Sequence, residues 1–259
     1  MPEVVRVLMD EFHNEETRLR VYDDLKNTIV GTWKIDLYIN TSGPLTSNLL
    51  KDYSALVIIG PRKGARGTEF KLDELQAITE FVHDGGIVLF TPSYNSKEYK
   101  ENFVNKLGID YLGASSKIAT DFSTHPFVKG VSKLQAPWFR TTLMTFEWQS
   151  IARVPLGVRS FPVVAVRDYG SGKFVYVAST MLFSKSFLGK FDNDRLVENI
   201  FTWIRDSGKT ILVEEKKTQV PKGKFIQTAP SKKHCPHCGY EAPSYALYCP
   251  NCGAYIGEE

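Results

Sequence analysis

The sequence predicts an α/β domain, with a parallel sheet flanked by helices, followed by a small cysteine-rich ribbon. Apolar runs of strand length alternate with stretches of helical period over residues 1–212, and parallel sheets with right-handed crossovers produce this alternation. The run Ala55–Ile59 is continuously apolar and ends at Gly60, as a strand buried on both faces does. All four cysteines lie within residues 235–252 as two Cys-x-x-Cys-Gly pairs, which predicts a separate metal-binding unit.

The first half of the domain contains six predicted elements. Its strands are short apolar or alternating runs, and its helices carry apolar residues three or four positions apart. The turn Asp84-Gly85-Gly86 predicts the end of the second helix. In order, the elements are strand Val4–Met9, helix Glu15–Asn27, strand Trp33–Ile39, strand Ala55–Ile59, helix Leu72–His83 and strand Ile87–Phe90.

The second half is richer in predicted strands. Alternating or apolar runs predict strands over Thr142–Trp148, Pro162–Arg167 and Phe174–Ala178, with a turn at residues 169–172. A last helix is predicted over Asn193–Arg205, with Asp192 or Asn193 as its N-cap.

The cysteine pairs Cys235/Cys238 and Cys249/Cys252 have the spacing of a tetrahedral four-thiolate site for one structural Zn²⁺. The glycine after each pair allows a positive φ, which turns backbone N–H groups toward sulfur. About 25 residues cannot bury enough surface to fold unaided, so the metal is expected to stabilise the ribbon. Iron in a rubredoxin-like site remains an alternative. Two disulfides would need an oxidising compartment, and the chain opens without the apolar stretch of a secretory leader.

Charge separates the ribbon from the segment before it. Residues 213–234 contain six lysines and two glutamates, together with prolines and glycine, which predicts a basic flexible linker. Residues 235–259 form the predicted zinc ribbon and contain three glutamates but no Lys or Arg. Because cations supply most of the affinity for nucleic acid, we expect the ribbon to dock to a protein partner, or to the main domain of its own chain, rather than to nucleic acid. Nucleic-acid association through the lysine-rich linker stays an alternative.

The remaining composition indicates a globular protein. No apolar run approaches the roughly 20 residues that a transmembrane helix needs, so we expect no membrane insertion. We therefore expect a soluble, cytoplasmic protein.

Several motifs of the main domain together resemble those of a known family. They are Tyr53–Pro61, Leu72–Gly86, Asp10-x-x-His13, His125-Pro126-Phe127, Tyr169–Lys173, Asp192-Asn193 and Trp203-Ile204. With these motifs the main domain resembles the class I glutamine-amidotransferase-like superfamily, and it is most similar to the branch that holds the GIFT domain of an intraflagellar transport protein and the gliding-motility-type auxiliary proteins of ABC transporters. The resemblance implies a flavodoxin-like fold over about residues 3–206. Members of this branch are often non-catalytic, and a zinc ribbon on one suggests an archaeal cytoplasmic variant.

Amidotransferase chemistry needs a cysteine nucleophile on a strand-to-helix turn, with a histidine base beside it. The ribbon takes every cysteine, and the matching position after Ile87–Phe90 reads Thr91-Pro92-Ser93. Ser93 is flanked by Pro92 and Tyr94 and lacks the glycines of a nucleophile elbow, so it is interpreted first as a helix cap. The motif His125-Pro126-Phe127 lacks the carboxylate of the superfamily's His-Pro-Glu. We therefore predict no glutaminase activity.

A ligand site is predicted at the carboxyl ends of the parallel strands, where open α/β sheets bind ligands. Its candidate residues come from three loops: Asp10 and His13, then Gly60, Arg62 and Lys63, then Ser93. Arg62 and Lys63 lie among glycines with exposed backbone N–H groups, which suits an anionic ligand. A solvated surface loop is the alternative interpretation, and a structural hydrogen bond is the alternative for His13.

Two functions follow. The first is a non-catalytic binding or scaffold protein, in which the degenerate amidotransferase-like domain binds a partner or an anionic small ligand and the ribbon docks to a protein. The second is a hydrolase or transferase that uses Asp10, His13 and Ser93.

Overall fold

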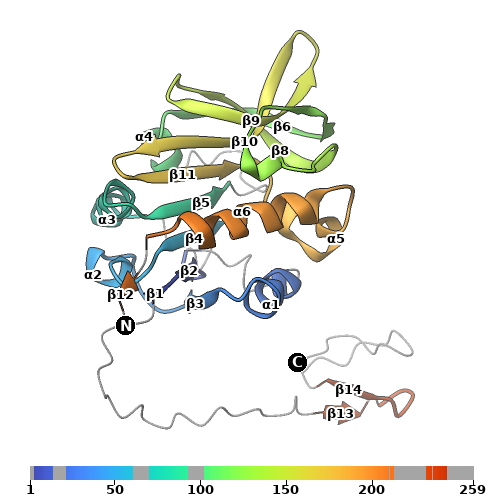
Figure 1. Ribbon diagram of the computed structural model, residues 1–259. Helices are drawn as coiled ribbons and strands as arrows, with labels where there is room; N and C mark the ends of the chain where they lie inside the picture. The colour runs from blue at the N-terminus through green and yellow to red at the C-terminus, as the bar shows by residue number, and fades with distance from the viewer. Residues whose placement is uncertain are drawn as a thin grey trace. The chain divides into compact units, whose positions relative to one another are not determined.

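We analysed a computed structural model of the chain, which describes residues 3–13, 22–60, 70–92, 102–209, 211–212, 232–234 and 236–243. The chain divides into two compact units, Met1–Glu214 and Glu215–Glu259. Figure 1 shows the elements of both units.

The first unit is built on an eight-stranded sheet in the order β3-β2-β4-β5-β11-β10-β9-β7. Its parallel part contains β2 (Arg6–Asp10), β3 (Asp36–Asn40), β4 (Ala55–Ile59), β5 (Ile87–Thr91) and β11 (Gly172–Val177). Counted along the chain, these five strands have the 2-1-3-4-5 order of flavodoxin-like sheets. Every residue of β4 and β5 is buried, as expected for central strands with helices on both faces.

Two groups of helices accompany this parallel part. They are α1 (Asp23–Gly31), α5 (Lys185–Leu188) and α6 (Asn193–Ser207), which contact one another, and α2 (Ser47–Leu50) with α3 (Leu72–His83). The chain moves from β2 outward to β3 through α1, then back across β2 to β4 through α2. Right-handed crossovers in opposite directions place α1 and α2 on opposite faces of the sheet. Trp33 stacks on Phe201 at 5.1 Å, which joins the segment after α1 to α6.

The rest of the first unit is largely antiparallel (Figure 1). In the large sheet, β11 pairs with β10 (Arg159–Tyr169), β10 with β9 (Trp148–Leu156), and β9 with β7 (Asp121–Phe122). A separate two-stranded sheet pairs β6 (Ile109–Ala119) with β8 (Leu134–Met144). The short helices here are α4 (Asn102–Lys106), η2 (Pro126–Val128) and η3 (Thr180–Phe183). Strands β1 (Glu3–Val4) and β12 (Ile211–Leu212) pair antiparallel and join the two ends of the unit.

The second unit contains one described hairpin, in which β13 (Lys232–His234) pairs with β14 (Glu241–Pro243). Strand β13 lies wholly inside the range 213–234 that the sequence predicts as linker. Gly239, directly after Cys238, has φ +71°, the positive value that the Cys-x-x-Cys-Gly pattern predicts. This angle fits the first predicted cysteine knuckle.

The predicted elements differ from the structure mainly in the second half. Strand β4 and helix α3 have the predicted bounds, whereas α1 continues past Asn27 to Gly31. The predicted strand Thr142–Trp148 is wrong: residues 145–147 lie between β8 and β9, and Trp148 begins a new strand. Strand β6 and most of β8 were not predicted, because their alternation is interrupted at two register shifts.

Asp192 occupies the predicted N-cap position of α6 but does not cap the helix with its side chain. Asp192 precedes the helix, but its side chain makes no capping hydrogen bond. Its Oδ2 instead accepts hydrogen bonds from the backbone N–H groups of Ser132 and Lys133 at 2.7 and 3.0 Å. Asp192 therefore links α6 to the segment before β8.

Candidate functional site

Two polar residues meet where the first two parallel strands end. Asp10 ends β2, Asn40 ends β3, and the two are register partners. The Asn40 amide donates to Asp10 Oδ1 at 2.9 Å and to the carbonyl of Gly43 at 2.8 Å. Asp10 is fully buried, so these hydrogen bonds replace the water that its carboxylate loses.

His13 lies between two carboxylates. Its Nδ1 lies 2.9 Å from Asp10 Oδ2, and its Nε2 lies 3.1 Å from Glu74 Oε1 at an angle that closes no hydrogen bond. Carboxylate oxygens accept hydrogen bonds, so the close contact of Nδ1 with Asp10 Oδ2 is compatible with an N–H donor on the ring. Both carboxylates and the ring are buried.

Glu74 connects this cluster to helix α3. Its Oε2 accepts from the backbone N–H of Lys71 at 3.0 Å, as the N3 glutamate of a capping box does, and its Oε1 accepts from the backbone N–H of Leu45 at 2.8 Å. Asp10, His13, Asn40 and Glu74, named here the carboxyl-edge cluster, thus join β2, β3, the segment before α2 and the start of α3.

Aromatic rings enclose His13. Phe70 lies tilted against it at 4.4 Å and Phe12 meets it edge-on at 4.9 Å. Beside it, the buried Glu11 carboxylate pairs with Lys26 of α1 at 2.6 Å. An Asp–His pair orients a catalytic base when the second ring nitrogen faces substrate. Here that nitrogen faces Glu74, so the arrangement joins loops and offers no accessible base.

Gly60 lies at the end of the next strand. Its N–H donates to the backbone carbonyl of Thr91 at 2.9 Å and is also 3.2 Å from Thr91 Oγ1. Gly60 follows β4 and Asp10 ends β2, and the strand order reverses between these two neighbouring strands. Ligands of open α/β sheets bind outside such a reversal.

The structure therefore brings together some of the predicted site residues. Asp10 and His13 are in contact, and Gly60 follows an adjacent strand. Arg62, Lys63 and Ser93 lie outside the described residues, as do Cys235, Cys249 and Cys252. Asn40 and Glu74 were missed, although Asn40 directly follows a predicted strand and Glu74 occupies the third position of a predicted helix.

The His125-Pro126-Phe127 motif has a local structural explanation. His125 precedes η2, and its Nδ1 accepts a hydrogen bond from the backbone N–H of Phe127 at 3.3 Å. Burial, together with Lys173, lowers the pKa of the His125 ring below its ordinary value of 6.5. The motif thus caps a short helix.

One of the four predicted zinc ligands, Cys238, lies among the described residues. Cys238 is exposed in the turn between β13 and β14, and the positive φ of Gly239 beside it fits a metal knuckle. Four thiolates in two Cys-x-x-Cys pairs are the donor set of a structural Zn²⁺ site. The residues therefore fit zinc.

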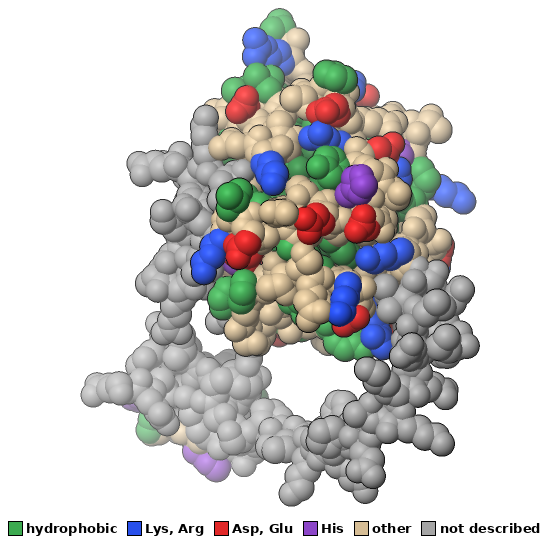
Figure 2. Space-filling model, turned by 90° about the vertical axis from the view of Figure 1, so that its left-hand side faces the viewer, with side chains coloured by type: hydrophobic (Ala, Val, Ile, Leu, Met, Phe, Trp, Pro, Cys, Tyr) green, Lys and Arg blue, Asp and Glu red, His purple; other side chains and the backbone are tan. Residues whose placement is uncertain are grey.

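The face of the first unit that carries α2 and α3 mixes both signs of charge (Figure 2). Lys and Arg side chains alternate with Asp and Glu, and hydrophobic side chains are scattered singly between them. Nucleic-acid surfaces are usually patches or stripes of positive charge. Nothing on the described part of this face has that character. Among the described residues, no helix is long and apolar enough to cross a membrane.

Comparison with known proteins identifies the C-terminal unit. Residues 234–256 match a zinc-ribbon domain. No curated protein matches the sequence. The archaeal origin that the resemblance suggests stays a prediction.

Solved structures share the fold of the first unit at low sequence identity. The mmIFT52 N-terminal domain matches with a TM-score of 0.63 and 16% identity, over 77% of this chain and 97% of that one. A putative ThuA-like protein from Bacteroides uniformis matches with a TM-score of 0.55 and 16% identity, over 80% and 93% of the two chains. A putative GMP synthase subunit from Thermoplasma acidophilum matches with a TM-score of 0.53 and 11% identity, over 80% and 96%.

These likenesses concern fold alone. The first unit shares with these structures an α/β fold with a mostly parallel sheet. One fold hosts many chemistries, so the likeness assigns no function.

Proposed function

We propose that the chain is a non-catalytic binding protein, in which the α/β unit recognises a ligand or partner and the zinc ribbon docks to a protein. One observation carries the proposal: His13 is fully buried, with its ring nitrogens facing Asp10 and Glu74. A general base must reach the proton that it removes. Because the four cysteines belong to the ribbon, the α/β unit also lacks a thiol nucleophile.

The second part of the proposal is a ligand site at the carboxyl ends of β2 and β4. Gly60 lies next to the strand reversal between β2 and β4, and Arg62 and Lys63 follow it in the sequence. Cations and glycine N–H groups close to such a reversal would suit an anionic small molecule. The buried carboxyl-edge cluster supports this site by holding the ends of β2 and β3 together.

The ribbon is the third part. Residues 235–259 contain glutamates and tyrosines but no Lys or Arg, and the described residues His234 and Pro236–Tyr240 are exposed. Lys232 and Lys233 lie directly before them in β13. Exposed apolar and aromatic groups with few cations beside them favour a protein surface over a phosphate backbone.

The test compares proteins captured by the intact chain with those captured by Cys238→Ser. His237→Ala is the matched control, since it changes the same turn and keeps four thiols. We expect quantitative mass spectrometry to show a defined set of proteins that His237→Ala retains and Cys238→Ser loses. Equal capture by both variants would remove the docking role from the ribbon, and recovery of nucleic acid that survives Cys238→Ser would favour the lysine-rich segment instead.

A further inference from the structure

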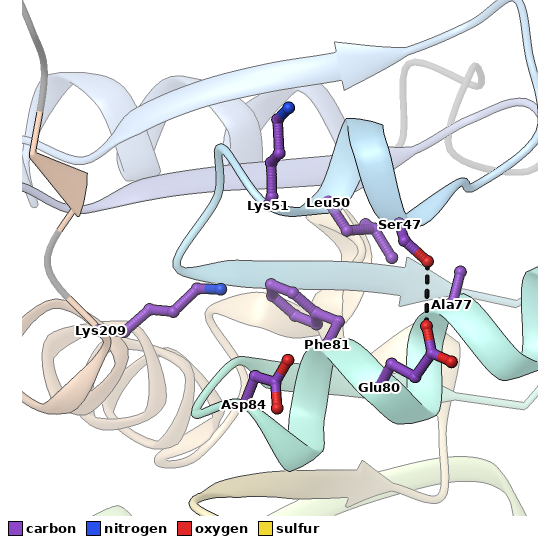
Figure 3. A pocket seen from close by; sticks show the side chains of 8 residues that line it. All are labelled: Ser47, Leu50, Lys51, Ala77, Glu80, Phe81, Asp84 and Lys209. Carbon is purple, nitrogen blue, oxygen red and sulfur yellow. Dashed lines mark hydrogen bonds between the residues drawn. The ribbon is translucent and has the colours of Figure 1, made fainter.

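A groove between α2 and α3 contains a lysine in an unusual position (Figure 3). Lys209 follows α6 and reaches into the groove toward the ring of Phe81. Its Nζ lies 4.7 Å from the ring centroid. The other residues that line the groove are Ser47, Leu50, Lys51, Ala77, Glu80 and Asp84.

The charges around Lys209 leave it without a close carboxylate. Glu80 accepts hydrogen bonds from Ser47 at 3.1 Å and from Gln76 at 2.8 Å, and the Asp84 carboxylate lies 3.2 Å from His83 Nδ1. Among the described residues, none forms an ion pair with Lys209. Burial lowers the pKa of Lys209 below its ordinary value of 10.5, and the more distant Asp84 opposes this shift.

Three other lysines of the unit have a carboxylate partner. Lys26 pairs with Glu11 at 2.6 Å, Lys185 with Asp24 at 3.5 Å, and Lys173 with Asp168. A neighbouring carboxylate favours the ammonium form, which has no lone pair to react. Lys51, on the rim of the same groove, donates to Asn48 Oδ1 at 2.6 Å and points away from Phe81.

We propose that Lys209 is an acylation site, which reacts with small acyl phosphates through an amine held in this groove. The groove can also accommodate the acylated lysine that the reaction produces. Its floor consists of Leu50, Ala77 and Phe81, which offers apolar contact to a short acyl group. Acylation converts the ammonium into a neutral amide, so a partly buried charge is removed.

Transfer of the acyl group from phosphate to Lys209 needs no further reagent. The Nζ lone pair attacks the carbonyl carbon of the acyl phosphate and forms the N–C bond. The C–O bond to phosphate breaks, inorganic phosphate leaves with the bonding pair, and the nitrogen proton passes to solvent. A neutral amine is required. Half-burial without an ion pair favours it at Lys209, and the Phe81 ring, which attracts the ammonium, opposes it.

The test exposes the full chain to limiting acetyl phosphate at about pH 8, below the ordinary lysine pKa of about 10.4. Mass spectrometry of peptides then gives the acetylation rate of each lysine. We expect Lys209 to react about threefold faster than Lys51 or more, because burial lowers the pKa of the Lys209 amine and so raises the fraction of that amine that is neutral. Asp84→Asn should widen this difference, since it removes the carboxylate that raises the pKa of Lys209.

A denatured sample is the control for local sequence, and there the two lysines should react at similar rates. A Lys209 rate at or below that of Lys51 in the folded chain overturns the proposal. A preference that persists unchanged after denaturation also overturns it, because the groove would then have no part in the reactivity.

Discussion

Asp10 and Asn40 end two neighbouring parallel strands as register partners, and the Asn40 amide donates to Asp10 Oδ1 at 2.9 Å. The same amide donates to Gly43, so it satisfies a buried carboxylate and a turn carbonyl together. This hydrogen-bonded pair therefore joins the carboxyl ends of β2 and β3.

Replacing Asn40 by Ala should destabilise the first unit by about 1–3 kcal/mol, because a buried acceptor loses its donor. Urea unfolding followed by circular dichroism measures the change. Asn48→Ala is the control, since the side-chain bond that it removes, to Lys51, is exposed, and its effect should stay within about 0.5 kcal/mol. Equal effects of the two variants would show that Asp10 does not depend on Asn40.

Replacing His13 by Ala should cost about 3–5 kcal/mol, because two buried carboxylates would lose the ring between them. His83→Ala is the matched control: its side chain is 68% exposed beside Asp84, so its removal should have little effect. In the double variant with Glu74→Gln, the loss should be smaller than the sum of the single losses. Strict additivity would argue against a direct interaction between His13 and Glu74.

Acid should reveal the contribution of Asp192. Hydrogen bonds from Ser132 and Lys133 lower the pKa of its carboxyl below the ordinary value of 3.8. A depressed folded-state pKa stabilises the protein above the unfolded value, and this contribution disappears as the pH falls through the folded-state pKa. Asp192→Asn should therefore be less stable than the unmodified chain at neutral pH, with a gap that closes below about pH 4. A gap that is independent of pH would contradict the role assigned to these hydrogen bonds.

The sequence predicts the local elements well and the tertiary contacts poorly. Strand β4 and helix α3 were predicted because each carries its own signal, a continuous apolar run or a helical period with glycines after it. Asp10 and His13 were predicted together, since they are three residues apart. Asn40 and Glu74 reach them across 30 and more residues, and no spacing in the sequence indicates that contact.

The antiparallel half of the first unit shows a second limit of prediction from the sequence. The strand predicted over Thr142–Trp148 joins the end of β8 to the start of β9, because the turn between them contains Phe146, an apolar residue that is 97% exposed. Hydrophobicity alone gives no sign that such a residue lies at a turn. The partner strands, which set the real boundaries, lie far away in the sequence.

The purified chain should contain about one zinc ion, and Cys238→Ser should lose it. Elemental analysis distinguishes zinc from iron. A strong chelator should remove the metal and unfold the ribbon, while the thermal transition of the first unit stays unchanged, because its core contains none of the cysteines. Iron in place of zinc, or full metal content in Cys238→Ser, would refute the proposed site.

The most direct test of the central claim is an assay for hydrolytic turnover by the purified chain. Release of product from glutamine and from activated esters, amides and phosphoesters would be compared for the unmodified chain, His13→Gln and Ser93→Ala. We expect rates equal to that of buffer for all three proteins. Turnover by the unmodified chain that both variants lose, while His83→Ala keeps it, would contradict a non-catalytic role and establish an enzyme at the carboxyl edge.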